Sequence, residues 1–220
     1  MKKLWIIGAG GLGREVYSWA IQHPDYQKVW EIAGFIDDIL YNQGYEENKI
    51  AKYISKDLLL ESFETYKITD SDLFVVAIAD ADIRRKVFKE LKNCSANIIT
   101  FIHPTVTIGQ NVQIGIGTII CPHAILTCDI VVGEGVIINI QACIGHDVEI
   151  DDYVTVSGGV HITGGCKIGS DVVFGTNSSL VPLTKVEDKA FLGANSLGVG
   201  KIKSNNTVLG VPARRIKIGE

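Results

Sequence analysis

Large apolar residues occupy every sixth position through the second half of the chain, without interruption from Ile102 to Leu192. These positions are Ile102, Ile108, Ile114, Ile120, Leu126, Val132, Ile138, Ile144, Ile150, Val156, Ile162, Ile168, Phe174, Leu180, Val186 and Leu192. Because 46% of the chain is hydrophobic, chance would give such a run with odds of ~4 × 10⁻⁶, and a period of six fits neither a helix nor a strand. A hexapeptide repeat is typical of a parallel β-helix, in which each hexad forms one side.

Three hexads close one coil, so residues 18 apart are expected to stack at the ~4.8 Å spacing of paired strands. This spacing predicts neighbours from the sequence alone. The hexads run without insertion to Leu192, after which Gly198, Gly200 and Ser204 break the pattern. The segment from Val208 to Ile218 is expected to form a terminal cap.

Alternating strand and helix patterns fill the first part of the chain. Strands are expected at Leu4–Ile7, Glu31–Ile36 and Phe74–Ile78, helices at Arg14–Gln22 and Asp82–Leu91, and a loop around Tyr41 to Lys56. The predicted fold class is an α/β N-terminal βαβ (half-Rossmann-like) domain followed by an all-β parallel β-helix. The expected domains are residues 1–95, residues 102–200 and a C-terminal cap over residues 201–220.

Composition and charge argue against nucleic-acid binding, membrane association and a disulfide framework. A net charge of −4 over 220 residues argues against a nucleic-acid partner. The apolar stretches are short, so we expect no transmembrane span, no signal peptide, no membrane partner and a cytoplasmic location. The five cysteines are odd in number and fall mostly in the repeat, which predicts reduced thiols.

A glycine-rich turn follows the first expected strand, Gly8-Ala9-Gly10-Gly11-Leu12-Gly13. Glycines let a backbone approach a diphosphate, and the helix N-terminus supplies N–H donors. Asp37 ends the second strand, where a carboxylate can hold a ribose hydroxyl. Only one nucleotide-binding half fits before the hexads begin, which favours a mononucleotide or nucleotide sugar over NAD. A purely structural turn is the other alternative.

His146 carries the strongest chemical signal of the repeat. The 18-residue spacing places Gly164 one coil away from His146, which puts a base beside a backbone donor, the minimum needed for acyl transfer. The alternative is an ordinary surface histidine. The same spacing stacks Cys128 with His146, and Cys143 with His161, but two ligands do not make a zinc site and no CxxC occurs. No metal is therefore expected.

Four features together resemble the bacterial hexapeptide-repeat sugar acyltransferases: the GAGGLG turn, the hexads, the Ile144-Gly145-His146-Asp147 segment and the GVPARR tail. The resemblance covers essentially the whole chain and lies nearest to the nucleotide-sugar N-acetyltransferases and the sialic acid O-acetyltransferases. It implies a left-handed β-helix, a homotrimer, and acetyl-CoA bound between neighbouring helices.

The resemblance also implies roles for residues of the β-helix. His146 would be the general base, and Asp147 would raise its basicity. Gly164 would be the backbone partner of the acetyl carbonyl. Thr176 and Ala194, which are 18 residues apart, would contact the pantetheine of CoA through their backbones.

In the N-terminal domain the resemblance places Gly11, Leu12 and Gly13 around the phosphates of the substrate. It places Asp37 and Asp38 near the nucleoside, although both could instead cap the next turn.

Three positions complicate the comparison with this family. Thr155, expected in the cofactor site, stands where related N-acetyltransferases often have a second histidine. Leu12 replaces a common polar residue. His146 and Asp147 can interact only at a corner of the coil, since consecutive residues of a flat strand face opposite ways.

The expected function is transfer of acetyl from acetyl-CoA to the amino group of a UDP-, dTDP- or GDP-linked 4-amino-4,6-dideoxy sugar, a step of glycan biosynthesis. One alternative is O-acetylation of a sugar hydroxyl, as for sialic acid. A second alternative is a non-catalytic scaffold that binds nucleotide sugars.

Overall fold

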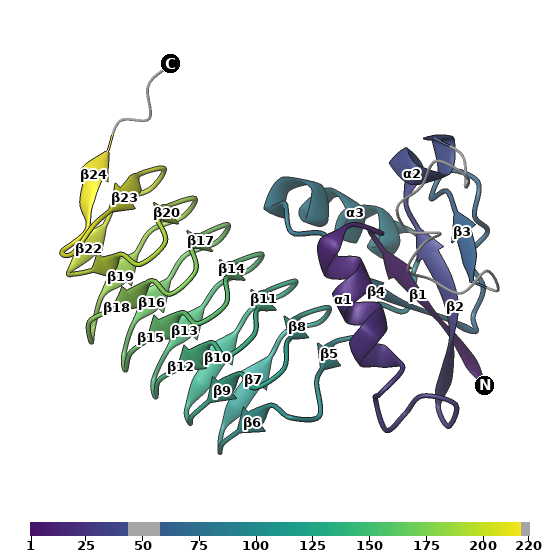
Figure 1. The fold of residues 1–220 in the computed structure, drawn as a ribbon, viewed down its shortest axis with the longest axis horizontal. Coiled ribbons are helices and arrows are strands. Elements are labelled where there is room, and N and C mark those ends of the chain that lie inside the picture. Colours follow the sequence, from purple (N-terminus) through teal and green to yellow (C-terminus); the bar gives the residue numbers. More distant parts are fainter. Residues whose placement is uncertain (44–57, 217–220) are drawn as a thin grey trace. The chain divides into compact units, whose positions relative to one another are not determined.

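The computed structural model describes residues 1–43 and 58–216 and divides the chain into two compact units, Met1–Ile99 and Thr100–Glu220. Figure 1 shows the helices of the first unit and the stacked coils of the second. Most of the loop expected around Tyr41 to Lys56, and the end of the expected cap beyond residue 216, lie outside the described residues.

The first unit is built on a parallel four-stranded sheet in the order β3-β2-β1-β4. Its strands are β1 (Lys2–Ile7), β2 (Trp30–Ile36), β3 (Leu59–Glu61) and β4 (Asp72–Val76), and its helices are α1 (Gly11–Ala20), α2 (Asp38–Gln43) and α3 (Ala81–Asn93). Every residue of β4 is buried, as expected for a parallel strand covered on both faces. The half-Rossmann-like prediction is confirmed.

Several local predictions for this unit were wrong. The third expected strand begins at Asp72 rather than Phe74, because buried Asp72 accepts hydrogen bonds from Trp5, Tyr66 and Thr69 and so extends the strand into the core. Helix α1 begins inside the glycine turn rather than at Arg14. Strand β3 and helix α2 were not expected; Tyr41 lies in this short helix rather than in a loop. Both elements are too short for a periodic pattern.

The second unit is a parallel β-helix with three sides, named here in the order in which the chain visits them. The first side contains β5 (Phe101–Ile102), β8 (Ile119–Ile120), β11 (Ile137–Ile138), β14 (Thr155–Val156), β17 (Val173–Phe174), β20 (Phe191–Leu192), β23 (Thr207–Leu209) and β24 (Arg214–Ile216). The second side contains β6 (Thr107–Ile108), β9 (Ile125–Leu126), β12 (Cys143–Ile144), β15 (His161–Ile162), β18 (Ser179–Leu180) and β21 (Leu197–Gly198). The third side contains β7 (Val112–Ile114), β10 (Ile130–Val132), β13 (Glu149–Ile150), β16 (Lys167–Ile168), β19 (Lys185–Val186) and β22 (Lys201–Ile202).

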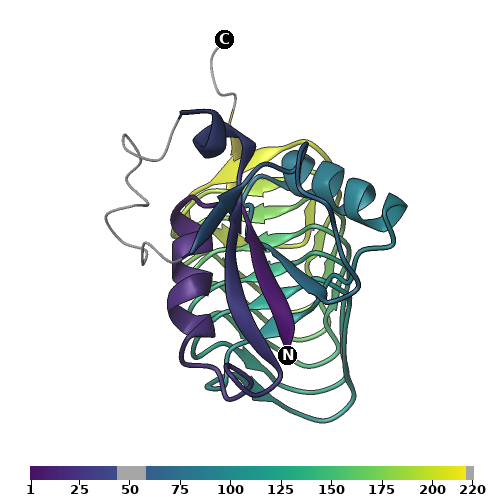
Figure 2. The same cartoon turned by 90° about the vertical axis from the view of Figure 1, so that its right-hand side faces the viewer.

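The register confirms the 18-residue spacing. Ile102 pairs with Ile120, Ile144 with Ile162, and Phe174 with Leu192. Figure 2 shows the coils stacked one behind another. The β-helix prediction therefore holds for the whole run of hexads.

The last coil is shorter by two residues. Leu180 still pairs with Gly198, 18 positions on, but Val186 pairs with Ile202, only 16 positions on. The shortening falls where the glycines break the pattern. Beyond it, β24 turns back antiparallel to β23, so the described part of the expected cap is a hairpin.

The corners of the coil require an unusual backbone. Every sixth residue from Asn111 to Asn195 has a positive φ, near +60°, a region that Gly, Asn and Asp adopt most easily. Asp147 is one of these corner residues, with φ 57°. The chain turns sharply between His146 and Asp147, which meets the condition for their side chains to interact.

From Ile120 to Leu192 the apolar residue of each hexad is buried in the core, so its truncation should destabilise the β-helix. Phe174 is fully buried, and Phe174→Ala is expected to lower the free energy of unfolding by about 3–5 kcal/mol. Phe191→Ala is the matched control, because the Phe191 ring is 41% exposed. Urea unfolding followed by circular dichroism measures both, and equal losses would contradict this assignment of the core.

Candidate functional site

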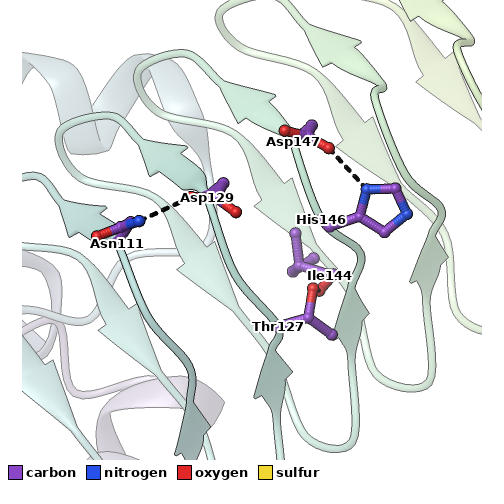
Figure 3. A network of polar contacts seen from close by, with 6 residues as sticks. All are labelled: Asn111, Thr127, Asp129, Ile144, His146 and Asp147. Carbon is purple, nitrogen blue, oxygen red and sulfur yellow. Dashed lines mark hydrogen bonds and ion pairs between the residues drawn. The ribbon is translucent and has the colours of Figure 1, made fainter.

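His146 and Asp147 form a hydrogen-bonded pair at the corner between β12 and β13. The His146 Nδ1 lies 2.7 Å from the Asp147 Oδ2 (Figure 3). The side chains are 67% and 68% exposed, so they are open to a ligand. The contact at Nδ1 favours the tautomer with its lone pair on Nε2, and Nε2 has no hydrogen-bond partner among the described residues. This arrangement suits a general base.

Gly164 lies directly under the imidazole, as the 18-residue spacing predicts. A Cβ placed on Gly164 would lie 2.6 Å from both Cε1 and Nε2 of His146, so only glycine fits there. Within the described residues, the Gly164 N–H donates no hydrogen bond. The corner therefore presents a base and an unused backbone donor side by side.

A second acid stands one coil below the pair. The Asn111 Nδ2 donates to the Asp129 Oδ1 over 2.9 Å (Figure 3). This hydrogen bond, with one from Cys128, lowers the pKa of Asp129 below its usual value. The hydrogen bond to Asp129 raises the pKa of the Cys128 thiol, so the thiol stays protonated. Sequence reasoning missed Asp129, although it stands 18 positions before Asp147 and that spacing would have revealed it.

The expected cofactor residues lie away from this corner within one chain. Thr176 and Ala194 are exposed at the corner between the first and second sides. His146 lies at the opposite edge of the second side, between the second and third sides, and Thr155 lies on the first side. A single chain therefore does not gather the predicted set into one site.

Cys143 pairs with His161 on the second side, as the spacing predicts. In the described part of the chain, no three histidine, cysteine or acidic side chains are grouped so that they could hold a metal ion.

The glycine turn of the first unit has the form of an anion site. A Cβ on Gly13 would lie 1.9 Å from the Gly8 carbonyl oxygen, so Gly13 allows α1 to pack closely against β1. Nothing lies within 4 Å of a Cβ placed on Gly10 or Gly11. The N–H groups of Gly11, Leu12 and Gly13 have no hydrogen-bond acceptor in the described residues. They lie at the N-terminus of α1, the positive end of the helix dipole.

Asp37 and Asp38 both hold the surrounding backbone. Asp37 accepts hydrogen bonds from the N–H groups of Ala9, at 2.9 Å, and of Leu40, at 3.1 Å. The Oδ1 of Asp38 accepts from the Ser62 Oγ and the Phe63 N–H, each at 2.7 Å. Asp37 therefore caps the N-terminus of α2, which is the alternative role expected for it. A role toward a nucleoside remains open to the Asp38 Oδ2.

None of the described helices combines the length and hydropathy needed to cross a bilayer.

Comparison with known proteins identifies relatives for both units. Residues 3–91 match the PglD N-terminal domain. The chain is 28% identical over 223 residues to the GDP-perosamine N-acetyltransferase of Escherichia coli O157:H7, covering 97% of this chain and 81% of the relative.

Solved structures agree in fold. The acetyltransferase domain of PglB from Neisseria gonorrhoeae FA1090 is 27% identical, with a TM-score of 0.86, covering 98% of this chain and 100% of that one. The same domain in complex with acetyl coenzyme A matches with a TM-score of 0.85. PerB from Caulobacter crescentus, in complex with CoA and GDP-perosamine, is 18% identical with a TM-score of 0.81 and covers 99% of this chain and 98% of that one.

The domain match, the full-length relative and the shared β-helix agree with the hexads and the glycine turn of the sequence. The chain is therefore similar over its whole length to hexapeptide-repeat sugar acyltransferases, and its residues 3–91 match the PglD N-terminal domain.

Proposed function

We propose that this protein transfers an acetyl group from acetyl-CoA to the amino group of a nucleotide-linked 4-amino-4,6-dideoxy sugar. The observation that carries the proposal is the His146–Asp147 pair lying against the bare backbone of Gly164. A relative named as an N-acetyltransferase, and an acetyltransferase domain solved with acetyl coenzyme A, support the reaction class. A cytoplasmic location belongs to the proposal, because acetyl-CoA is the co-substrate.

In this mechanism the sugar amine attacks the carbonyl carbon of the thioester while the His146 Nε2 accepts a proton from the amine. Asp147 orients the ring through Nδ1 and stabilises the imidazolium, as acids commonly do for a general-base histidine. The Gly164 N–H stabilises the oxyanion of the tetrahedral intermediate. The intermediate collapses, the C–S bond breaks, and the CoA sulfur leaves with the proton returned from His146.

We propose further that the site is shared between copies of a homotrimer. Closing three copies around a threefold axis with their second sides inward brings the His146 corner of one copy against the Thr176 and Ala194 corner of the next. The two groups of residues that one chain separates would then flank a single acetyl-CoA.

The outward side chains of the β-helix favour this orientation. The second side presents a column without lysine, arginine or acidic side chains, made of Ile125, Cys143, His161, Ser179 and Leu197. The third side carries ion pairs between Lys167 and Glu149, at 2.9 Å, and between Lys201 and Glu187, at 2.5 Å. Interface cores are depleted of charge, so the second side is a better candidate than the third for contact between copies.

The first unit supplies the nucleotide-sugar site in this proposal. The diphosphate would lie over the free N–H groups of Gly11, Leu12 and Gly13, and the Asp38 Oδ2 would face the nucleoside.

The test is a thiol-release assay with acetyl-CoA against UDP-, dTDP- and GDP-linked 4-amino-4,6-dideoxy sugars, each beside its 4-hydroxy counterpart. We expect turnover only with an amino sugar. Turnover confined to a hydroxyl acceptor would favour the O-acetyltransferase alternative. Binding of nucleotide sugar without any binding of CoA would favour the non-catalytic scaffold.

A further inference from the structure

A cavity of about 270 Å³ opens in the first unit beside the glycine turn. It lies at the carboxyl ends of β1 and β2, and α3 forms one wall. Its apolar lining includes Ile39 and Ile83, which are 72% and 53% exposed. Large aliphatic side chains left exposed in the lining of a cavity suit the face of a flat ring.

The position of the cavity beside the glycine turn indicates that the ring is the base of a nucleotide. Gly8 lines the cavity and also begins the turn whose N–H groups have no acceptor in the described residues. In open parallel sheets, ligands bind at the carboxyl ends of the strands. A diphosphate over the turn would therefore carry its nucleoside toward this cavity, with the base against its apolar lining.

The polar edge of the cavity comes from α3. Lys86 and Glu90 are one helical turn apart, both line the cavity, and their Nζ and Oε1 atoms lie 3.9 Å apart. The edge thus offers a cationic donor beside a carboxylate with two acceptor oxygens. The Asp37 oxygens and the Asp38 Oδ1 already accept backbone or hydroxyl donors. Glu90 is therefore the carboxylate on the α3 wall that is left to meet a base.

We infer that Glu90 reads guanine, so that this site selects a guanosine-diphosphate-linked sugar. A carboxylate forms two parallel hydrogen bonds only with two adjacent donors. Guanine presents N1–H and the N2 amino group side by side, with O6 next to them for Lys86. Uracil and thymine present one N–H between two carbonyls, and adenine and cytosine present an amino group beside an acceptor nitrogen. The inference rests on the proposed nucleotide-sugar site and names its base.

Calorimetric titration of the full chain with GDP, inosine diphosphate and UDP tests the inference. We expect GDP to bind at least about tenfold more tightly than the other two, because each lost hydrogen bond at a carboxylate weakens binding by roughly that factor. Inosine diphosphate differs from GDP only by the missing N2 amino group.

The variant Glu90→Gln sharpens the test. Its amide offers one acceptor and one donor, which match the N1–H and O2 of xanthine. We expect GDP affinity to fall about 10- to 100-fold and xanthosine diphosphate to become the preferred ligand. Glu31→Gln is the control, because exposed Glu31 lies near the start of β2, away from the carboxyl ends of the strands.

The outcomes distinguish guanine selectivity from nucleotide-sugar binding itself. If UDP binds as well as GDP and Glu90→Gln changes neither affinity, the reading of guanine is wrong while the nucleotide site stands. If none of the nucleotides binds, the nucleotide-sugar function itself fails.

Discussion

Replacing His146 with alanine is expected to lower turnover by about 10²- to 10⁴-fold, the usual contribution of general-base catalysis. The side chain is two-thirds exposed and contacts Asp147 and the surface of Gly164, so its loss removes chemistry without opening the core. Stability and acetyl-CoA affinity should stay near those of the unchanged protein. The measurement is kcat from thiol release, with calorimetry for CoA binding.

His123→Asn provides the control for that experiment. His123 is an exposed corner histidine with φ 60°, a conformation that asparagine tolerates. This variant should keep full activity. Near-full turnover in His146→Ala would remove His146 from the mechanism, and an equal loss in both variants would point to damage of the solenoid.

The β-helix could be derived from the sequence because its contacts repeat at a constant interval. The neighbour of any residue in the repeat follows by adding 18, and this spacing alone predicts that Gly164 lies against His146, as it does. The interval failed only where the last coil loses two residues, so that Val186 meets Ile202. A local deletion has no periodic signal of its own.

The first unit was less predictable because its contacts do not repeat. Its parallel sheet followed from the alternation of patterns, but the bonds of Asp37 to Ala9 and Leu40 depend on how distant segments pack. The cavity that Ile39 and Ile83 help to line likewise depends on how distant segments pack. No spacing rule connects these residues, and the sequence predicted helix α3 without predicting that it forms a wall of this cavity.

His146 lies at one edge of the second side, and Thr176 and Ala194 lie at the other edge. This separation predicts a large loss of activity when the Ala194 corner is blocked. Ala194 is exposed at the corner between the first and second sides, so Ala194→Trp should fold normally and fill the proposed pantetheine channel. Alone, it should lose nearly all activity, as should His146→Ala. If the site lies between copies, the Ala194→Trp chain still carries an intact His146 corner, and the His146→Ala chain still carries an intact Ala194 corner.

Mixing the two variants should therefore restore activity. In trimers assembled at random from equal amounts of His146→Ala and Ala194→Trp chains, about one quarter of the pairings between neighbours join an intact His146 to an intact Ala194. We expect about that fraction of the unmodified rate after co-expression, measured by thiol release. A double variant carrying both changes in one chain, mixed with unmodified chain, controls for simple dilution. A site contained within one chain would leave the mixture as inactive as its parts, since no chain in it would be intact.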